Sequence, residues 1–125
     1  MSASITKNAV EKWHQMIENR DMSILSELLA DDVMFRSPVA FKPYEGKAVV
    51  FFILTNVIQV FENFTYHREF YTEDGLNVVL EFSAIVSEKQ LKGIDMIRFN
   101  AEGQIVDFEV MIRSLSGLQA LGAQM

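Results

Sequence analysis

Apolar residues in the first part of the chain recur with the period of an α-helix. Val10, Trp13 and Ile17 are spaced i, i+3 and i+7, and polar residues occupy most positions between them. This spacing predicts an amphipathic helix with one buried face. A second, shorter helix is predicted for the leucine-rich stretch at residues 25–29, just before the pair Asp31-Asp32.

The central part of the chain contains a strand signal, a break and an ambiguous apolar run. Residues 33–36 predict a short strand, and the two prolines place an irregular connection at residues 37–46. The run that follows, 46–64, is rich in Val, Phe and Ile, which favour strands. Its polar residues, however, fall on one face of a helix, so we predict a helix packed on more than one side. Those polar residues are Thr55, Asn56, Gln59, Glu62 and Asn63.

The second half of the chain alternates between apolar and polar residues, as strands do. Turn residues separate the runs, and Gly103 stands where a hairpin turn needs a positive φ. A short C-terminal helix is predicted at residues 114–124. The predicted strands are 65–72, 77–87, 91–99 and 105–113.

Helices followed by successive strands predict an α+β fold. One arrangement of these elements is a strongly curved antiparallel sheet with the N-terminal helices packed on its concave face. Such an arrangement leaves a cavity between the helices and the sheet, where a functional site would lie.

Composition and charge then narrow the function. The 125 residues match the size of one domain (1–125), half of them are hydrophobic, and there are no Cys and only 2 His. We therefore expect no disulfide, thiol chemistry, metal or cofactor. The net charge is −6 and basic residues are scattered singly, so we expect neither nucleic-acid nor membrane binding. With no signal-peptide pattern and no long apolar run, the expected location is cytoplasmic.

The order of several short segments resembles the nuclear-transport-factor-2-like superfamily, in its SnoaL-like and ketosteroid-isomerase-like branch. The resemblance spans essentially the whole chain and implies a cone-shaped, cystatin-like roll. Because this fold hosts isomerases, dehydratases, cyclases, epoxide hydrolases and non-catalytic modules, it specifies function weakly. The segments are Arg20-Asp21, residues 30–33, Ser37-Pro38-Val39, Gly46 and residues 93–105.

The resemblance also indicates which catalytic groups are missing. Ketosteroid isomerases have a catalytic Asp immediately before the Pro-Val that follows the first strand, and here that residue is Ser37. Their oxyanion-hole Tyr on the first helix corresponds to Trp13, whose indole N–H donates but does not accept. Their second oxyanion donor corresponds to Asp95. Steroid isomerisation by that mechanism is therefore not expected.

Asp95 is the main catalytic candidate, because it interrupts an otherwise apolar strand. Facing the cavity, it would be desolvated, its pKa would rise, and its neutral form could donate a hydrogen bond or act as a general acid. The alternative is a structural Asp paired with Arg or His or with backbone N–H groups. His67 is the second catalytic candidate, as part of a His67–Asp95 dyad, although a strand histidine is usually structural or solvated.

The predicted wall of the cavity consists of inward-facing apolar residues and one serine. Trp13 is equally a core residue on burial alone, and Ser37 before a proline is equally an ordinary turn residue. The predicted ligand-binding residues are Trp13, Ile17, Phe35, Ser37, Val39, Leu54, Phe82, Ile97, Phe108 and Val110.

Two functions remain open at this point. One is a cofactor-independent isomerase, cyclase or dehydratase acting on a small hydrophobic carbonyl compound, with Asp95 as acid or hydrogen-bond donor. The other is a non-catalytic module that binds a small hydrophobic ligand or serves as a dimeric interaction module. The charged rungs on the outer sheet face, including Glu81, Asp107 and Glu109, suggest solvent or a polar interface. The resemblance implies a homodimer through that convex face.

Overall fold

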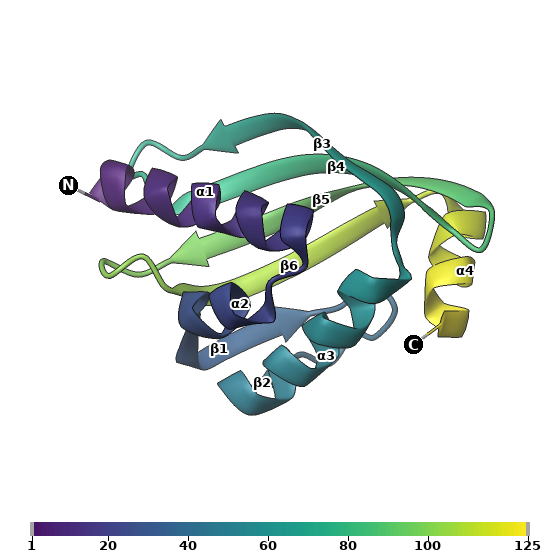
Figure 1. Cartoon of the computed structure of the whole chain (residues 1–125), viewed down its shortest axis with the longest axis horizontal. Helices are drawn as coiled ribbons and strands as arrows, with labels where there is room; N and C mark the ends of the chain where they lie inside the picture. Colours follow the sequence, from purple (N-terminus) through teal and green to yellow (C-terminus); the bar gives the residue numbers. More distant parts are fainter. Residues whose placement is uncertain (1, 125) are drawn as a thin grey trace.

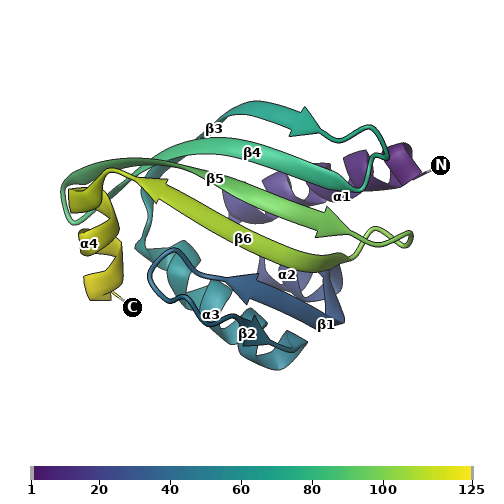
Figure 2. The same ribbon diagram turned by 180° about the vertical axis from the view of Figure 1, so that it is seen from behind.

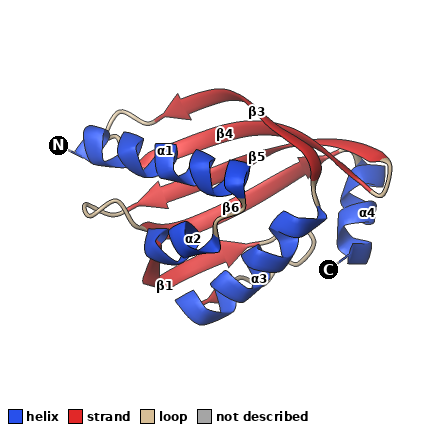
Figure 3. Cartoon of the chain, viewed as in Figure 1, coloured by secondary structure: helices blue, strands red, loops and turns tan. Residues whose placement is uncertain are grey.

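The computed structural model describes residues 2–124, which form four helices and six strands (Figures 1 and 3). Three helices, α1–α3, cover one face of the sheet, and α4 lies beside one end of it. The elements are α1 (Ser2–Asn19), α2 (Met22–Leu28), β1 (Leu29–Arg36), β2 (Tyr44–Glu45), α3 (Lys47–Val60), β3 (Glu62–Tyr71), β4 (Asn77–Val86), β5 (Lys89–Phe99), β6 (Ile105–Arg113) and α4 (Leu115–Gln124). Among the described residues, no helix is long and apolar enough to cross a bilayer.

The six strands form one curved, unclosed sheet in the order β2-β1-β6-β5-β4-β3. The predicted α+β fold is confirmed, with one difference: the sheet is mixed, because β1 pairs with β6 in parallel. The remaining pairs are antiparallel. β3 to β6 follow one another along the chain and reverse direction at each turn. The last of them, β6, lies beside β1 and runs in the same direction. Strand patterns in a sequence do not specify that partner.

The ambiguous run after Gly46 is a helix, as its polar residues predict. α3 buries Val50, Leu54 and Ile58, which recur every four residues on one face. The helix packs on more than one side, as expected, because it contacts α2 as well as β1 and β2, although Phe52 is 68% exposed. α3 therefore carries more apolar residues than its contacts with the sheet and with α2 bury.

Two strand boundaries differ from the prediction for reasons of packing. β1 begins at Leu29 rather than at residue 33, because Leu29 and Ala30 are buried and Leu29 pairs with Ile105 of β6. The two-residue strand β2 was not predicted, and it forms where Tyr44 pairs with Phe35. Local propensity is weak at both places, and tertiary pairing decides them.

The two faces of the sheet have different chemistry. Alternate residues of β4, among them Leu80 and Phe82, are buried beneath the helices. Figure 2 views the opposite face, which α1, α2 and α3 leave uncovered. There the Arg68 guanidinium donates to both carboxylate oxygens of Glu81 at 2.8 and 2.7 Å. Together with Lys92, 3.3 Å away, it lowers the pKa of Glu81 to about 2.

Gly93 lets a ring pack directly on the sheet. It pairs with Phe82 on one side and Ile112 on the other. A Cβ at this position would lie 2.6 Å from the Met111 carbonyl oxygen and 2.7 Å from the Phe82 ring. The missing side chain therefore allows Phe82 to lie over β5 at its observed position.

We expect Gly93→Ala to destabilise the fold by about 1–3 kcal/mol, because backbone and ring must both move to admit the methyl group. Gly122→Ala is the matched control. Its Cβ would meet Val39 at 3.4 Å, an ordinary contact, and alanine favours the helix. Chemical denaturation of both variants checks the prediction, and it is wrong if Gly93→Ala is as stable as the parent.

Candidate functional site

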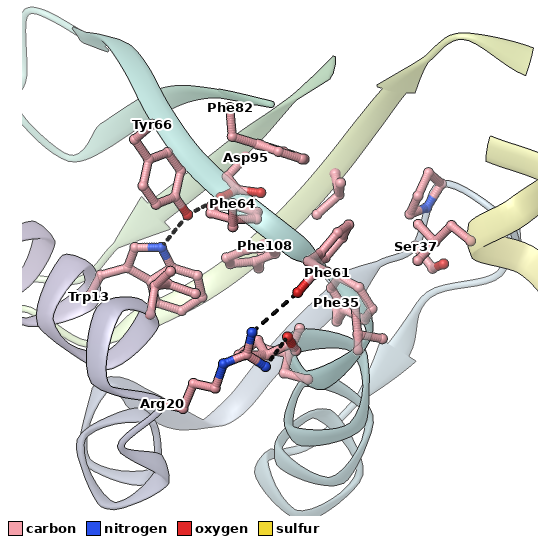
Figure 4. Close-up of a pocket in the computed structure, with 17 residues that line it drawn as sticks. Trp13, Arg20, Phe35, Ser37, Phe61, Phe64, Tyr66, Phe82, Asp95 and Phe108 are labelled. Carbon is pink, nitrogen blue, oxygen red and sulfur yellow. Dashed lines mark hydrogen bonds between the residues drawn. The ribbon is translucent and has the colours of Figure 1, made fainter. Parts of the chain in front are cut away.

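A cavity lies between the helices and the concave face of the sheet (Figure 4). The space open to the centre of a water molecule is about 60 Å³, several times the 10–15 Å³ that holds about one water. This is a small cavity, so a flat ligand fits it better than a bulky one. The lining residues are Trp13, Ile17, Arg20, Phe35, Ser37, Pro38, Leu54, Val57, Ile58, Phe61, Phe64, Tyr66, Phe82, Asp95, Phe108, Val110 and Leu121.

Seven of the 17 residues that line the cavity are aromatic. Phe64 and Phe82 stack with their ring centroids 4.8 Å apart, and Phe61 meets Phe64 edge to face at 5.3 Å. Across the cavity, Trp13 lies 5.0 Å from Phe108. Such rings are rigid and apolar, so the cavity wall excludes water from the polar groups set into it.

Three of those polar groups form a hydrogen-bonded relay from α1 to β5. The indole Nε1 of Trp13 donates to the Tyr66 hydroxyl at 2.7 Å. The Tyr66 hydroxyl in turn donates to Oδ2 of Asp95 at 2.6 Å (Figure 4). Because indole can only donate, the Tyr66 hydroxyl is the acceptor of the first bond, and its own proton points toward the carboxyl group in the second.

The surroundings of Asp95, at the end of the relay, raise the pKa of its carboxyl group. Asp95 is 4% exposed, and burial raises its pKa to about 7, although the hydrogen bond from Tyr66 acts to lower it. Among the described residues, no side-chain hydrogen bond reaches its second oxygen, Oδ1. Asp95 lines the cavity, so that oxygen is available to a ligand. Near neutral pH the group can therefore both hold and release a proton.

Tyr66 remains a donor across the ordinary pH range. Burial, the charge of Asp95 and the hydrogen bond to it raise the pKa of Tyr66 well above its usual value. The ring of His14 packs against Tyr66 edge to face, at 4.8 Å between centroids. These contacts hold the phenol in place over Asp95.

The predicted His67–Asp95 dyad is wrong. His67 is exposed, and its Nε2 lies 2.8 Å from the Ser83 hydroxyl, on the uncovered face of the sheet. Successive side chains of a strand point to opposite faces. Since Tyr66 points inward, its neighbour His67 points outward, and it is Tyr66 that contacts Asp95.

Two predicted ligand-binding residues lie away from the cavity wall. Ile97 is buried on the correct face, but it packs into the core two residues beyond Asp95. Val39 is 38% exposed and borders a separate surface hollow beside Phe41. The other predicted members line the cavity, and their binding role stays a prediction: Trp13, Ile17, Phe35, Ser37, Leu54, Phe82, Phe108 and Val110.

Sequence reasoning missed Tyr66, Arg20, Phe61 and Phe64. Phe64 and Tyr66 are two residues apart, and this spacing signals a common face of β3, but register shifts interrupt that strand. Arg20 follows α1 and carries no periodic signal, so only the tertiary structure brings it to the cavity.

The sequence matches the SnoaL-like domain family over residues 10–108. The crystal structure of a steroid delta-isomerase from Pseudomonas aeruginosa is 56% identical with a TM-score of 0.93, covering 96% of this chain and 88% of that one. The chain belongs to the SnoaL-like domain family. No curated protein gives a significant match.

Further solved structures agree with this SnoaL-like domain in fold. A protein with a cystatin-like fold from Silicibacter pomeroyi is 34% identical with a TM-score of 0.87, covering 93% of this chain and 81% of that one. An NTF2-like protein from Mesorhizobium loti is 13% identical, with a TM-score of 0.80 and coverage of 91% and 95%. The resemblance to this superfamily is confirmed.

The position before Pro38 holds no base in this SnoaL-like domain. Ser37 is 8% exposed, and its hydroxyl accepts a hydrogen bond from the Val39 backbone N–H at 3.2 Å, as in an ordinary serine turn. Among the lining residues, only Arg20, Tyr66 and Asp95 are ionisable. Within residues 2–124 there is also no cluster of three His, Asp or Glu side chains that could hold a metal ion.

Burial of Asp95 makes the stability of the domain depend on pH. Its pKa is 3.8 when unperturbed and about 7 in the folded protein, so between these values the folded state binds the proton more tightly. Stability is therefore lost as pH rises from about 4 to 7. We expect the wild type to lose on the order of 4 kcal/mol relative to Asp95→Asn over this range.

Urea unfolding of both proteins at several pH values from 4 to 8 measures this difference. Asp74→Asn is the control, because hydrogen bonds from Thr72 and Leu76 lower the pKa of Asp74, and its contribution has the opposite sign. Parallel stability curves for the wild type and Asp95→Asn would contradict the assignment.

Proposed function

We propose that this SnoaL-like domain binds a small, flat, hydrophobic carbonyl compound in the cavity and acts on it without a cofactor. The observation that carries the proposal is the buried Asp95 carboxyl, with one oxygen bonded to Tyr66 and the other available to a ligand. In this proposal Asp95 is the acid or hydrogen-bond donor to the carbonyl oxygen of the ligand.

The chemistry follows from the protonation of that carboxyl group. Neutral Asp95 donates its proton toward the carbonyl oxygen and polarises the C=O bond, which promotes enolisation, cyclisation or loss of water. When the proton is transferred, the carboxylate that remains accepts the hydrogen bond from Tyr66 at Oδ2. In an isomerisation, that carboxylate takes the proton of the α-carbon, which gives the enol and neutral Asp95. Asp95 then protonates the other end of the enol and recovers the proton of the enol oxygen, so the residue is regenerated.

Isomerisation is the reaction class with the strongest support. The Pseudomonas aeruginosa protein at 56% identity is named a steroid delta-isomerase, and isomerisation moves one proton between two carbon atoms. In this chain Ser37 cannot be the base that carries it. A proton shuttle would therefore have to use Asp95 itself, whose pKa of about 7 suits both removal and return of a proton.

A non-catalytic binding module is the second candidate. It is favoured by the serine at position 37 and by the small number of ionisable groups in the cavity. In that case Asp95 and Tyr66 orient a ligand by hydrogen bonds, and no covalent bond changes.

We expect flat aromatic ketones and phenols to raise the melting temperature of the wild type. A ligand at about a hundredfold excess over its dissociation constant stabilises the fold by roughly 2.7 kcal/mol. A ligand that accepts the Asp95 proton should bind more weakly to Asp95→Asn, because an amide is a weaker donor than a carboxylic acid. Thermal shift with both proteins measures this, and Asp74→Asn serves as the exposed control.

The results separate the two functions. Turnover by the wild type that is lost in Asp95→Asn supports the acid role, whereas binding by the wild type without turnover indicates the passive module. If no ketone or phenol shifts either protein, the cavity is not a site for this class of ligand.

We also propose that the uncovered face of the sheet pairs with a second copy of the chain. Three large apolar side chains on that face are exposed in the single chain: Phe70 is 53% exposed, Met111 48% and Met96 38%. Phe70 pairs with Val79 and Val79 pairs with Met96. These three residues therefore form a continuous apolar row across the strands, between charged residues. Apolar cores with polar rims are typical of protein interfaces.

Light scattering after gel filtration should give twice the 14.3 kDa mass of one chain. Met111→Glu should give the monomer mass, because it buries a charge in the interface. Phe52→Glu is the matched control, since Phe52 is exposed on α3, on the other side of the sheet. A monomeric wild type, or a Met111→Glu dimer of unchanged affinity, would refute this interface.

A further inference from the structure

Arg20 connects the end of α1 to the end of α3 at the edge of the cavity. It follows the last residue of α1 in a left-handed conformation, with φ of 52°. Its guanidinium donates to the carbonyl oxygens of Ile58 at 3.0 Å and Phe61 at 3.2 Å (Figure 4). Arg20 is exposed while Asp95 is buried, and both line the cavity, so they mark its outer and inner parts.

The positive charge of Arg20 is not neutralised within the described part of the chain. Its partners are two backbone carbonyls and, at 3.2 Å, the side-chain amide oxygen of Gln59. None of the ion pairs among residues 2–124 includes it. These three bonds use three of the five N–H donors of a guanidinium group, which leaves two for another acceptor.

Arg20 is also the one lining residue that is permanently charged. Tyr66 remains neutral, and Asp95 is mostly protonated below pH 7. The cavity therefore carries about one positive charge within a protein whose net charge is −6. An anionic group on a ligand would find its most favourable position beside Arg20.

We propose that the ligand is a flat hydrophobic carboxylic acid whose carboxylate pairs with Arg20 and whose carbonyl group lies against Asp95. The inference rests on the function proposed above and narrows its substrate class to keto acids and related aromatic acids. The two polar ends are recognised by groups of opposite kind, a fixed cation at the edge and a proton donor inside. The apolar body of the ligand lies between them, against the aromatic wall.

A purely structural role for Arg20 predicts a different result. Bonds to the last carbonyls of α3 cap that helix, so removing them lowers stability whatever the ligand is. A cap does not, however, discriminate between a charged ligand and a neutral one of the same shape. The preference for charge is thus the measurement that separates recognition from capping.

The experiment compares acid and amide forms of the same aryl ketone at pH 6. The probes are 6-acetyl-2-naphthoic acid and 6-acetyl-2-naphthamide, with 4-acetylbenzoic acid and 4-acetylbenzamide as a shorter pair. We expect the wild type to bind the carboxylate about three- to tenfold more tightly than the amide, as measured by calorimetry. Arg20→Gln should bind both forms equally, whereas Arg20→Lys should keep part of the preference because it keeps the charge.

Arg98→Gln is the matched control for net charge, because Arg98 lies on the uncovered face of the sheet, paired with Asp107 across the β5–β6 ladder. It should keep the full preference for the carboxylate. Equal binding of acid and amide by the wild type, or a preference that survives in Arg20→Gln, overturns the inference and leaves the proposed function standing. Binding of neither form to the wild type overturns both. A ratio of affinities is insensitive to any general loss of stability in the variants.

Discussion

The hydrogen bond from Tyr66 to Asp95 is the interaction on which the rest of the site depends. A lone carboxyl group buried among aromatic rings would be costly to ionise and free to rotate. The phenol binds one oxygen and fixes the plane of the group, and Trp13 fixes the phenol in turn. The second oxygen is left as a single oriented donor or acceptor in an otherwise apolar space. Preorganised groups of this kind do not have to rearrange when a ligand arrives.

The curvature of the sheet and the placement of the helices create the space for that interaction. The relay combines Trp13 of α1, Tyr66 of β3 and Asp95 of β5, three elements far apart in sequence. Gly93 has no side chain, and this leaves room for the Phe82 ring in the cavity wall. The cavity is therefore a property of the whole domain, and no single segment contains the site.

Charge is divided between the two faces of the sheet. On the uncovered face Arg36 pairs with Asp107, and Arg68 and Lys92 pair with the nearly buried Glu81. Among the residues that line the cavity, charge is limited to Arg20 at its edge and the titrating Asp95 inside. The partly exposed Arg36–Asp107 pair is screened by water and adds little to stability. In the proposed function, the two groups inside select the ligand.

The sequence alone was sufficient for the fold class and the helix at α3, and it identified Asp95 as the acidic residue of an apolar strand. These features depend on local period: polar residues on one side of a helix, and strict alternation along β5. It was not sufficient for the partner of Asp95, which is Tyr66 and not His67, or for the place of Arg20. In β3 two register shifts disturb the alternation, and Arg20 reaches the cavity from a turn. Which side chains meet across a sheet or between helices depends on register and packing, and those are decided only when the chain has folded.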